Sequence, residues 1–368
     1  TPLYSSAASD VYKRQRLCMD RRAWYAVFVV ILLGLAGCST VSYYGQAVCG
    51  HVNLILRSNS IERLLQDQRV DVQTAERLAL VLKIRNFATD TLALPDNSSY
   101  TRYTHLDRNY AVWSVFATPE FSIEPVTWCF PVAGCVAYRG YFDRQRAEAF
   151  GLELGASGLD IFSGPVAAYS TLGWWPDPVL NTIVERPDAD LAGLIFHELA
   201  HQVAYVKDDT AFNESFATFV EEKGVAQWLA AVGDRGALAR YRVQRRWQHR
   251  VVEMITRQRE VLARLYESDL SPEALRKGKI HHFGQLRILY HTEKIAGGHP
   301  STWDHWMFGP PNNARLNAIA TYYHYLPAFE SLFEASDSNF PAFFEAVRTL
   351  ADRPPAERLQ ALSRLMAM

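Results

Sequence analysis

The sequence lacks an excess of charge of either sign. Its 38 lysines and arginines nearly balance 39 aspartates and glutamates, so the formal charge of the 368-residue chain is −1. A chain without a field of one sign has no long-range attraction for nucleic acid or for an acidic surface. It also lacks the polar bias of a disordered chain, since 49% of its residues are hydrophobic and 21% are charged. We therefore expect a folded globular protein that does not bind nucleic acid.

The sequence also lacks an apolar run that would form a good transmembrane helix. The run at residues 23–35 is shorter than the roughly 20 apolar residues that a spanning helix needs. It follows a basic pair and ends in the tetrapeptide Leu35-Ala36-Gly37-Cys38. A basic start, an apolar middle and a small-residue cleavage site are the parts of an export signal. We therefore predict a signal peptide at residues 19–37, preceded by residues 1–18 that are non-native or unstructured.

The end of this segment has a further implication. The Leu-Ala-Gly-Cys sequence resembles the lipobox of bacterial lipoproteins, in which the cysteine becomes the acylated first residue of the mature chain. The resemblance implies lipidation of Cys38, and Ser39 after it resembles the signal for sorting to the outer membrane. It therefore implies a protein of the bacterial cell envelope that is held by a lipid anchor and faces the periplasm.

Cysteine is scarce, with 5 residues in the chain, and an exported chain can form disulfides between them. Cys129 and Cys135 enclose the short segment Phe-Pro-Val-Ala-Gly, which contains turn residues. In an oxidising compartment a disulfide can close such a loop if the two Cβ atoms face each other. The alternative is a pair of buried free thiols. The disulfide would leave Cys49 unpaired.

The order of the predicted elements favours an α+β fold with a small mixed sheet and a predominantly helical C-terminal part. Strands followed by helices, rather than alternating with them, are typical of this class, and no internal repeat is present. We treat residues 38–368 as one domain, with helices plus the sheet in 38–190 and mainly helices in 191–368. The spacing of apolar residues predicts helices at 43–56, 75–87, 191–206, 211–232, 240–267, 272–293, 314–325 and 341–350, and strands at 111–117, 126–130, 135–142 and 159–170.

The arginine-rich run at residues 240–259 has a simple interpretation. Its apolar residues Val243, Trp247, Val251 and Met254 fall on one helical face. We therefore expect the arginines to form the solvated face of a packed helix rather than a surface for lipid or nucleic acid.

The strongest chemical signal is His-Glu-x-x-His at His197, Glu198 and His201, inside a helical pattern. Residues four apart lie on the same face of a helix, so both imidazoles can reach one metal ion. Neutral imidazole is a good zinc ligand, and Glu198 is placed to hydrogen-bond a zinc-bound water instead of binding the metal. The pattern predicts hydrolysis in which Glu198 is the general base.

A third ligand is expected from the next predicted helix, which starts near Phe212-Asn213-Glu214-Ser215-Phe216-Ala217. The interval of 13 positions from His201 to Glu214 allows the chain to turn back, so Glu214 can complete a site with two histidines, one glutamate and an open fourth position. Glu221 is the alternative, because it lies two turns further on about the same helix face. Asp208 and Asp209, between the two helices, are candidates to orient the histidine Nδ1–H groups, although an acidic turn needs no such role.

Taken together, the chain resembles the predicted zinc-dependent aminopeptidase lipoprotein family of proteobacteria, which is gluzincin-like. The resemblance implies a membrane-anchored peptidase of zincin-like fold with one Zn²⁺ ion per chain. It extends over nearly all of the chain from Met19 onward. It is carried by the lipobox, by the metal-site segments just described, and by Trp128-Cys129-Phe130-Pro131-Val132-Ala133-Gly134-Cys135, Tyr138-Arg139-Gly140-Tyr141-Phe142 and Ala168-Tyr169-Ser170-Thr171-Leu172-Gly173-Trp174.

Two alternatives to an aminopeptidase remain open from the sequence: an envelope endopeptidase, and a zincin-fold lipoprotein that acts only as an assembly or binding module. A pure binding module does not need a carboxylate for acid-base work, so Glu198 favours an enzyme. We expect residues 167–173 to form a strand that borders the cleft, where a substrate could add as a further strand. The group that stabilises the oxyanion is open among Tyr290, His281, His282, Tyr322 and Tyr323.

Overall fold

The computed structural model describes residues 38–130 and 133–367. The predicted signal peptide and the residues before it lie outside the described residues, and so does the side chain of Cys38, the first residue of helix α2 (Cys38–Leu56). Residues from Asn53 onward form one compact unit, separate from the unit that ends at Val52. Within the described ranges, no helix is both long and apolar enough to cross a membrane.

Within residues 38–130 and 133–367, the β-structure consists of three small sheets. The largest has the order β6–β3–β7 and is antiparallel throughout, formed by β3 (Val112–Pro119), β6 (Arg139–Tyr141) and β7 (Leu159–Val166). A second sheet pairs β2 (Arg102–Thr104) with β1 (Asn59–Ser60) in antiparallel and β8 (Val179–Leu180) in parallel orientation. The third is a hairpin of β4 (Trp128–Phe130) and β5 (Gly134–Val136).

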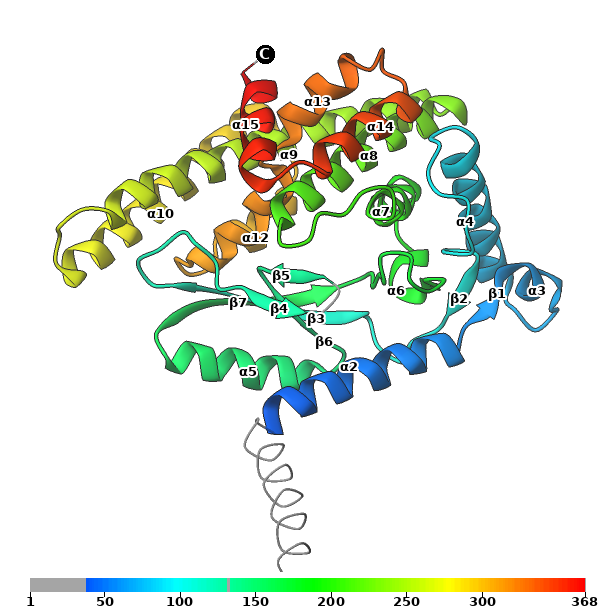
Figure 1. Cartoon of the computed structure of the whole chain (residues 1–368), viewed down its shortest axis with the longest axis horizontal. Helices are drawn as coiled ribbons and strands as arrows, with labels where there is room; N and C mark the ends of the chain where they lie inside the picture. Colours follow the sequence, from blue (N-terminus) through cyan, green and yellow to red (C-terminus); the bar gives the residue numbers. More distant parts are fainter. Residues whose placement is uncertain (1–37, 131–132, 368) are drawn as a thin grey trace, which may run out of the picture. The chain divides into compact units, whose positions relative to one another are not determined.

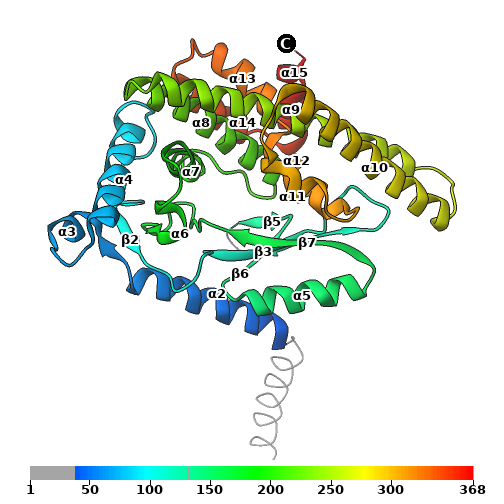
Figure 2. The same ribbon diagram turned by 180° about the vertical axis from the view of Figure 1, so that it is seen from behind.

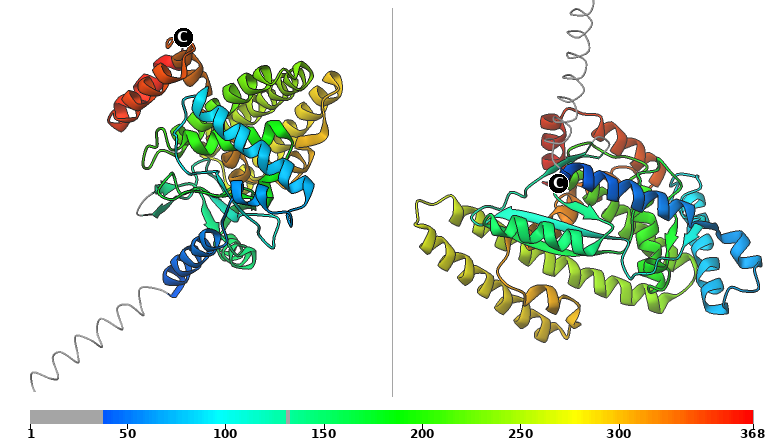
Figure 3. Two further views of the ribbon diagram at one scale, coloured as in Figure 1. Left: turned by 90° about the vertical axis from the view of Figure 1, so that its right-hand side faces the viewer. Right: turned by 90° about the horizontal axis from the view of Figure 1, so that it is seen from below.

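Helices surround the largest sheet and make up most of the chain, which gives the α+β class that the sequence indicates. Helix α5 (Arg144–Ala156) and helix α12 (Asn313–Tyr323) both pack against β3 and β7. Viewed from below, α5 lies in front of the strands that it covers (Figure 3). Helices α9 (Arg235–Tyr266) and α10 (Pro272–Gly297) run alongside each other in the same view.

Two further helices lie between the sheets and the helical layer. Helix α7 (Asp188–Ala200) packs along α8 (Thr210–Ala231), and both views place α7 between α8 and the strands (Figure 1, Figure 2). The remaining helices of the described chain are α3 (Ile61–Gln66), α4 (Val72–Asp90), α6 (Asn181–Val184), η1 (Ser301–Trp303), α11 (Asp304–Met307), α13 (Leu326–Glu334), α14 (Phe340–Ala351) and α15 (Pro355–Met366).

Most of the longer helices begin at a side chain that caps their free N–H groups. Asp209 accepts a hydrogen bond from the Phe212 N–H at the start of α8, and Asp234 does the same for Ala237 at the start of α9. At α10, the Ser271 hydroxyl is the cap and a proline follows it. Asp, Ser and proline at these positions satisfy or remove donors that a helix leaves unpaired.

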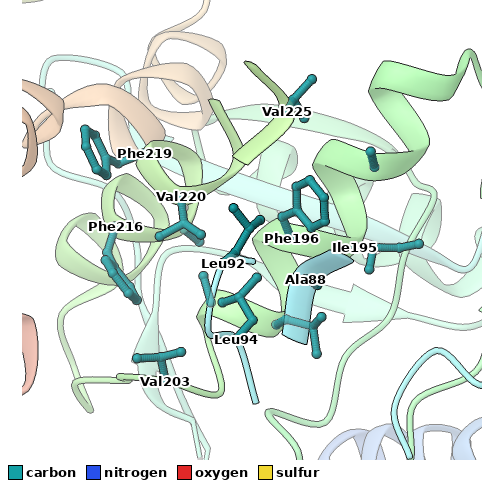
Figure 4. Packing of buried hydrophobic residues seen from close by; sticks show 14 of the residues in the cluster. Ala88, Leu92, Leu94, Ile195, Phe196, Val203, Phe216, Phe219, Val220 and Val225 are labelled. Atoms are coloured by element: carbon teal, nitrogen blue, oxygen red, sulfur yellow. The ribbon is translucent and has the colours of Figure 1, made fainter. Parts of the chain in front are cut away.

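The main core holds α7 and α8 in place. Phe196 of α7 packs beside Ala88 of α4, beside Leu92 just after that helix, and beside Val225 of α8 (Figure 4). On its other side, α8 presents a row of phenylalanines to α13 and α14. Burial of each aromatic ring stabilises the fold by about 1.5–3 kcal/mol. This row and its partners are Phe212, Phe216, Phe219, Phe329, Phe333, Phe343 and Phe344.

Several predicted boundaries differ from the structure. The strand predicted at residues 135–142 is divided into β5, which pairs with β4, and β6, which pairs with β3. The strand predicted to reach residue 170 ends at Val166, so residues 167–173 are not a strand at the cleft. Side chains satisfy the backbone there instead: Thr182 donates to the Ala167 carbonyl, and Asp177 accepts from the Thr171 N–H. The helix predicted to reach residue 206 has its last residue at Ala200, because a chain reversal toward α8 follows.

Candidate metal centre

Helix α7 carries the His-Glu-x-x-His pattern, and its opposite face is fully buried. Leu191, Ile195 and Leu199 have 0% exposure, which fixes the rotation of the helix about its axis. His201 follows the last residue of α7, but its backbone is still helical and its N–H donates to the His197 carbonyl over 3.3 Å. The two imidazole rings therefore lie on one face, with their centroids 4.9 Å apart.

Glu214, in the first turns of α8, meets both rings. Its Oε2 atom lies 3.3 Å from Nε2 of His197 and 3.7 Å from Nε2 of His201. All three side chains are largely buried, with 12%, 7% and 10% exposure in the order His197, His201 and Glu214. One ligand atom from each lies within 4.8 Å of the others. The three predicted ligands therefore form a group that can bind a metal ion.

Asn213 fixes the loop that brings Glu214 back to the histidines. Its side-chain amide closes on Val206, since Oδ1 accepts from the Val206 N–H and Nδ2 donates to the Val206 carbonyl, each over 2.7 Å. Asn213 is buried, so both bonds are shielded from water. The asparagine next to Glu214 thus holds the chain reversal, a role that the sequence alone did not indicate.

Glycines allow α7 and α8 to approach closely. A Cβ atom at Gly224 of α8 would lie 2.8 Å from the side chains of both Phe196 and Leu92. On α7, a Cβ atom at Gly193 would lie 3.1 Å from Cγ of Glu221. Any larger residue at these positions would push the helices apart and move the carboxylates of α8 away from the histidines.

Glu221 contacts the other ring nitrogen of His197. Its Oε2 atom lies 3.3 Å from Nδ1, on the side of the ring away from Nε2, and Oε1 accepts from Arg245 over 2.6 Å. A carboxylate in this position accepts the Nδ1–H and leaves Nε2 free as a ligand atom. Arg245 belongs to the arginine-rich helix, and its 15% exposure corrects the prediction that those arginines are all solvated.

Asp208 and Asp209, the two candidates to orient the histidines, make other contacts in the structure. Asp208 Oδ1 accepts from the backbone N–H of Cys135, and Asp209 caps α8 and pairs with Arg358 over 3.0 Å. Nearby backbone N–H groups and the Arg358 guanidinium therefore occupy these two carboxylates. In the described structure Glu221 occupies the position expected for them at His197, while Nδ1 of His201 has no hydrogen-bond partner.

Glu198 follows His197 on α7, and its carboxyl interacts with the charges of His197, Glu214 and Asp177. Burial raises the pKa of its carboxyl to about 7, and the negative charges of Glu214 and Asp177 add to this effect. The Ser170 hydroxyl lies within hydrogen-bonding reach of both Glu198 and Asp177. A carboxyl with a pKa near neutrality can both accept and return a proton, which is the property of a general base and acid.

The imidazoles of His197 and His201 differ in their affinity for a proton. Burial lowers the pKa of the His201 imidazole to about 4, so this ring is neutral. At His197 burial acts in the same direction, but the hydrogen bonds with Glu214 and Glu221 outweigh it and raise the pKa to about 10. The two carboxylates therefore make the space around His197 favourable for a cation.

Tyr322, at the end of α12, is the one of the five oxyanion candidates that lies at the histidines. Its ring centroid is 6.2 Å from that of His197. The negative charge of Glu214 and, secondly, burial raise the pKa of its phenol well above the usual value, so the hydroxyl keeps its proton. Tyr290 instead donates to Asp304, and Tyr323 accepts from Gln248.

The hairpin of β4 and β5 is closed by a disulfide between Cys129 and Cys135, the pair that the sequence indicates. Cys49 is the free cysteine among the described side chains. The hairpin is attached to the loop after α7: Tyr205 donates to the Ala133 carbonyl over 3.0 Å, in addition to the bond from Cys135 to Asp208. The disulfide therefore stiffens a segment that packs on the loop between the histidines and Glu214.

Comparison with known proteins bears on this site. The model of a family described as "Putative aminopeptidase" matches residues 42–362, which include all the residues of the site. The chain belongs to this family. No curated protein and no solved structure matches the chain. Membership in this aminopeptidase family indicates peptide hydrolysis, and the buried group of His197, His201 and Glu214 is the place in the described structure where a metal ion can bind.

Proposed function

We propose that the protein is a zinc-dependent peptidase, and specifically an aminopeptidase, of zincin-like fold. His197, His201 and Glu214 would hold one zinc ion, Glu198 would be the general base, and Tyr322 would donate a hydrogen bond to the substrate carbonyl. The observation that carries the proposal is the geometry of the three ligand atoms around one point, together with Glu198 beside them.

The donor set fits zinc in kind and in spacing. Tetrahedral zinc takes nitrogen and oxygen ligands at about 2.0–2.2 Å, so two ligand atoms on one ion lie about 3.3–3.5 Å apart. Glu214 Oε2 lies 3.3 Å from Nε2 of His197 and 3.7 Å from Nε2 of His201, which is close to this distance between two zinc ligand atoms. Two imidazoles and one carboxylate leave the fourth position open, as in catalytic sites, whereas structural sites use four protein ligands.

Each residue around the ion would have its own role in peptide hydrolysis. Zinc, when bound, lowers the pKa of a water molecule toward about 7 and polarises the scissile carbonyl. Glu198 takes a proton from the attacking water and delivers it to the leaving amine, so it ends the cycle in its starting state. Tyr322 keeps its proton at neutral pH and can stabilise the negative charge that develops on the carbonyl oxygen. Glu221 orients His197.

A direct test uses the purified protein and pairs of short peptides that differ only in N-terminal acetylation. We expect hydrolysis of the free peptides, loss of activity with a chelator, and recovery when zinc is added back. An aminopeptidase needs the free ammonium group, so acetylated peptides should remain intact. Equal cleavage of both forms would indicate an endopeptidase, and activity that resists the chelator would refute the metal-dependent mechanism.

Tyr322→Phe is expected to lower kcat by roughly 10²–10³ with little change in KM, because the hydroxyl acts only as charge develops on the oxyanion. Tyr290→Phe is the matched control, since it removes a buried tyrosine hydroxyl that donates to Asp304. Steady-state kinetics of both variants give the comparison. Equal and small effects on kcat would remove Tyr322 from the mechanism.

We also infer that the protein is anchored in the bacterial cell envelope by a lipid on Cys38 and faces the periplasm, at the outer membrane. The lipobox-like segment supports this location, and so does the Cys129–Cys135 disulfide, because disulfides persist in oxidising compartments. Cys38→Ala should yield a soluble or uncleaved precursor without fatty acid. Metabolic labelling with a radioactive fatty acid measures this, and unchanged labelling of the variant would contradict the anchor.

A further inference from the structure

We infer that Trp174 and Trp175 form a substrate subsite that receives an apolar or aromatic side chain next to the scissile bond. This inference rests on the proposed peptidase function and specifies the substrate class of the same site. It follows from three features of the segment: the exposure of its tryptophans, the rigid turn that presents them, and its contact with Gln202, the residue after His201.

The two tryptophans are unusually exposed. Trp174 has 72% exposure and Trp175 has 56%. Tryptophan is highly buried on average in folded proteins, and adjacent exposed tryptophans expose a large apolar area to water. Isolated exposed aliphatic residues need no explanation, but such a pair is typical of a surface that contacts a ligand.

A strained turn holds this segment in one conformation. The Trp174 N–H donates to the Thr171 carbonyl, and the turn between them has φ values of 57° at Leu172 and 80° at Gly173. A left-handed backbone is unfavourable for a leucine and persists only where surrounding contacts enforce it. The strain therefore supports a functional role for the turn.

The contacts that enforce the turn come from Thr171 and Asp177. The buried Asp177 accepts from both the N–H and the hydroxyl of Thr171, over 3.0 Å and 2.8 Å. The same hydroxyl accepts from the N–H of Trp175 over 3.1 Å. The indole rings are thus presented by a fixed backbone, which reduces the entropy lost when a substrate binds.

The segment is attached next to the metal centre. Ser170, at its start, donates to Asp177, whose negative charge acts on Glu198. A Cβ atom on Gly173, the residue before Trp174, would lie 3.1 Å from the side chain of Gln202, which directly follows His201. Glycine allows this close contact. The tryptophans therefore lie within the reach of a peptide bound at the centre.

The composition of the segment sets the substrate class. Residues 170–176 carry no charged side chain, so they offer no partner for an acidic or basic residue of the peptide. Indole faces bind apolar and aromatic side chains by burial and by ring stacking. We therefore expect a preference for residues such as leucine, tyrosine or phenylalanine beside the cleaved bond.

The test compares peptides of equal length that carry phenylalanine or serine on either side of the scissile bond. Trp174→Ala and Trp175→Ala should lower kcat/KM for the phenylalanine peptides by about 10- to 100-fold, mainly through KM, with less than a twofold change for the serine peptides. Phenylalanine in place of either tryptophan should retain most of the preference. Leu152→Ala, which truncates a side chain of α5 with 75% exposure, is the matched control and should change neither.

A binding measurement separates this inference from the proposed function. Calorimetric titration of the same peptides into zinc-loaded Glu198→Gln protein measures affinity without turnover. Loss of phenylalanine-peptide binding in the tryptophan variants would support the subsite even if the wild type cleaved no peptide. Equal losses for both peptides, or no loss for either, with unchanged thermal unfolding, would overturn it.

Discussion

Glu198→Gln is expected to lower kcat by roughly 10²–10⁴ while the protein still binds one zinc ion per chain. Glutamine has the shape of glutamate but cannot take a proton from water at neutral pH. The side chain lies beside the metal-binding group and is not one of the three residues whose ligand atoms converge, so its replacement should leave the donor set intact. The side-chain amide of a glutamine at this position can keep the interaction with Ser170.

The measurement pairs steady-state kinetics with metal analysis of the same preparation. A loss of activity together with a loss of zinc would mean that Glu198 supports the metal and not the proton transfer. Retained activity would exclude it as the base. The wild-type protein, purified and loaded in parallel, is the control for metal content.

Glu214→Gln is expected to lose both zinc and activity after dialysis against zinc-free buffer, because a neutral amide replaces the anionic ligand. Glu221→Gln is the matched comparison, an identical change two turns along the same helix. It should weaken zinc binding by roughly 10- to 100-fold, since it acts through the orientation of His197. At saturating zinc, Glu221→Gln should therefore be occupied and active.

Competition with a chromogenic chelator gives the zinc affinity of both variants. The opposite order, with full zinc in Glu214→Gln and none in Glu221→Gln, would show that the third ligand has been placed two turns too early. Thermal unfolding of the metal-free variants is needed as well. Glu221 neutralises the buried Arg245, and loss of that charge destabilises the fold independently of zinc.

The metal-binding group could be predicted largely from the sequence because it depends on local periodicity. Two histidines four residues apart must share a face of any helix, and the apolar spacing predicted that helix. The choice between Glu214 and Glu221 could not be made in this way, since seven residues are two turns and leave both on one face. The packing of α8 against α7 makes the choice, directing one carboxylate to Nε2 and the other to Nδ1 of His197.

The helices and strands, like the site, could be predicted only in part from the sequence. Most of the long helices and strand β3 were predicted to within a few residues, but α5, α13, α15 and the shortest helices and strands were not predicted. Helix α5 contains Gly151 and Gly155, each of which lowers helix propensity by about 1 kcal/mol relative to alanine. A Cβ atom at either position would lie within 3.7 Å of Ile161. These glycines serve close packing of α5 on β7, and a neighbour that is distant in the sequence leaves no local signal.

The sequence by itself determined the ligand types and their spacing on one helix, the cysteine pair, and the α+β order of elements, because each follows from covalent spacing and from the period of a helix or strand. Tertiary structure decided which carboxylates face His197, that Asp209 caps α8 and Asp208 binds the Cys135 N–H, and which tyrosine reaches the centre. It also placed the turn that precedes the exposed Trp174 and Trp175 against Gln202, next to His201. These outcomes depend on contacts between segments far apart in the sequence, such as that of His197 with Tyr322, whose energies no local pattern contains.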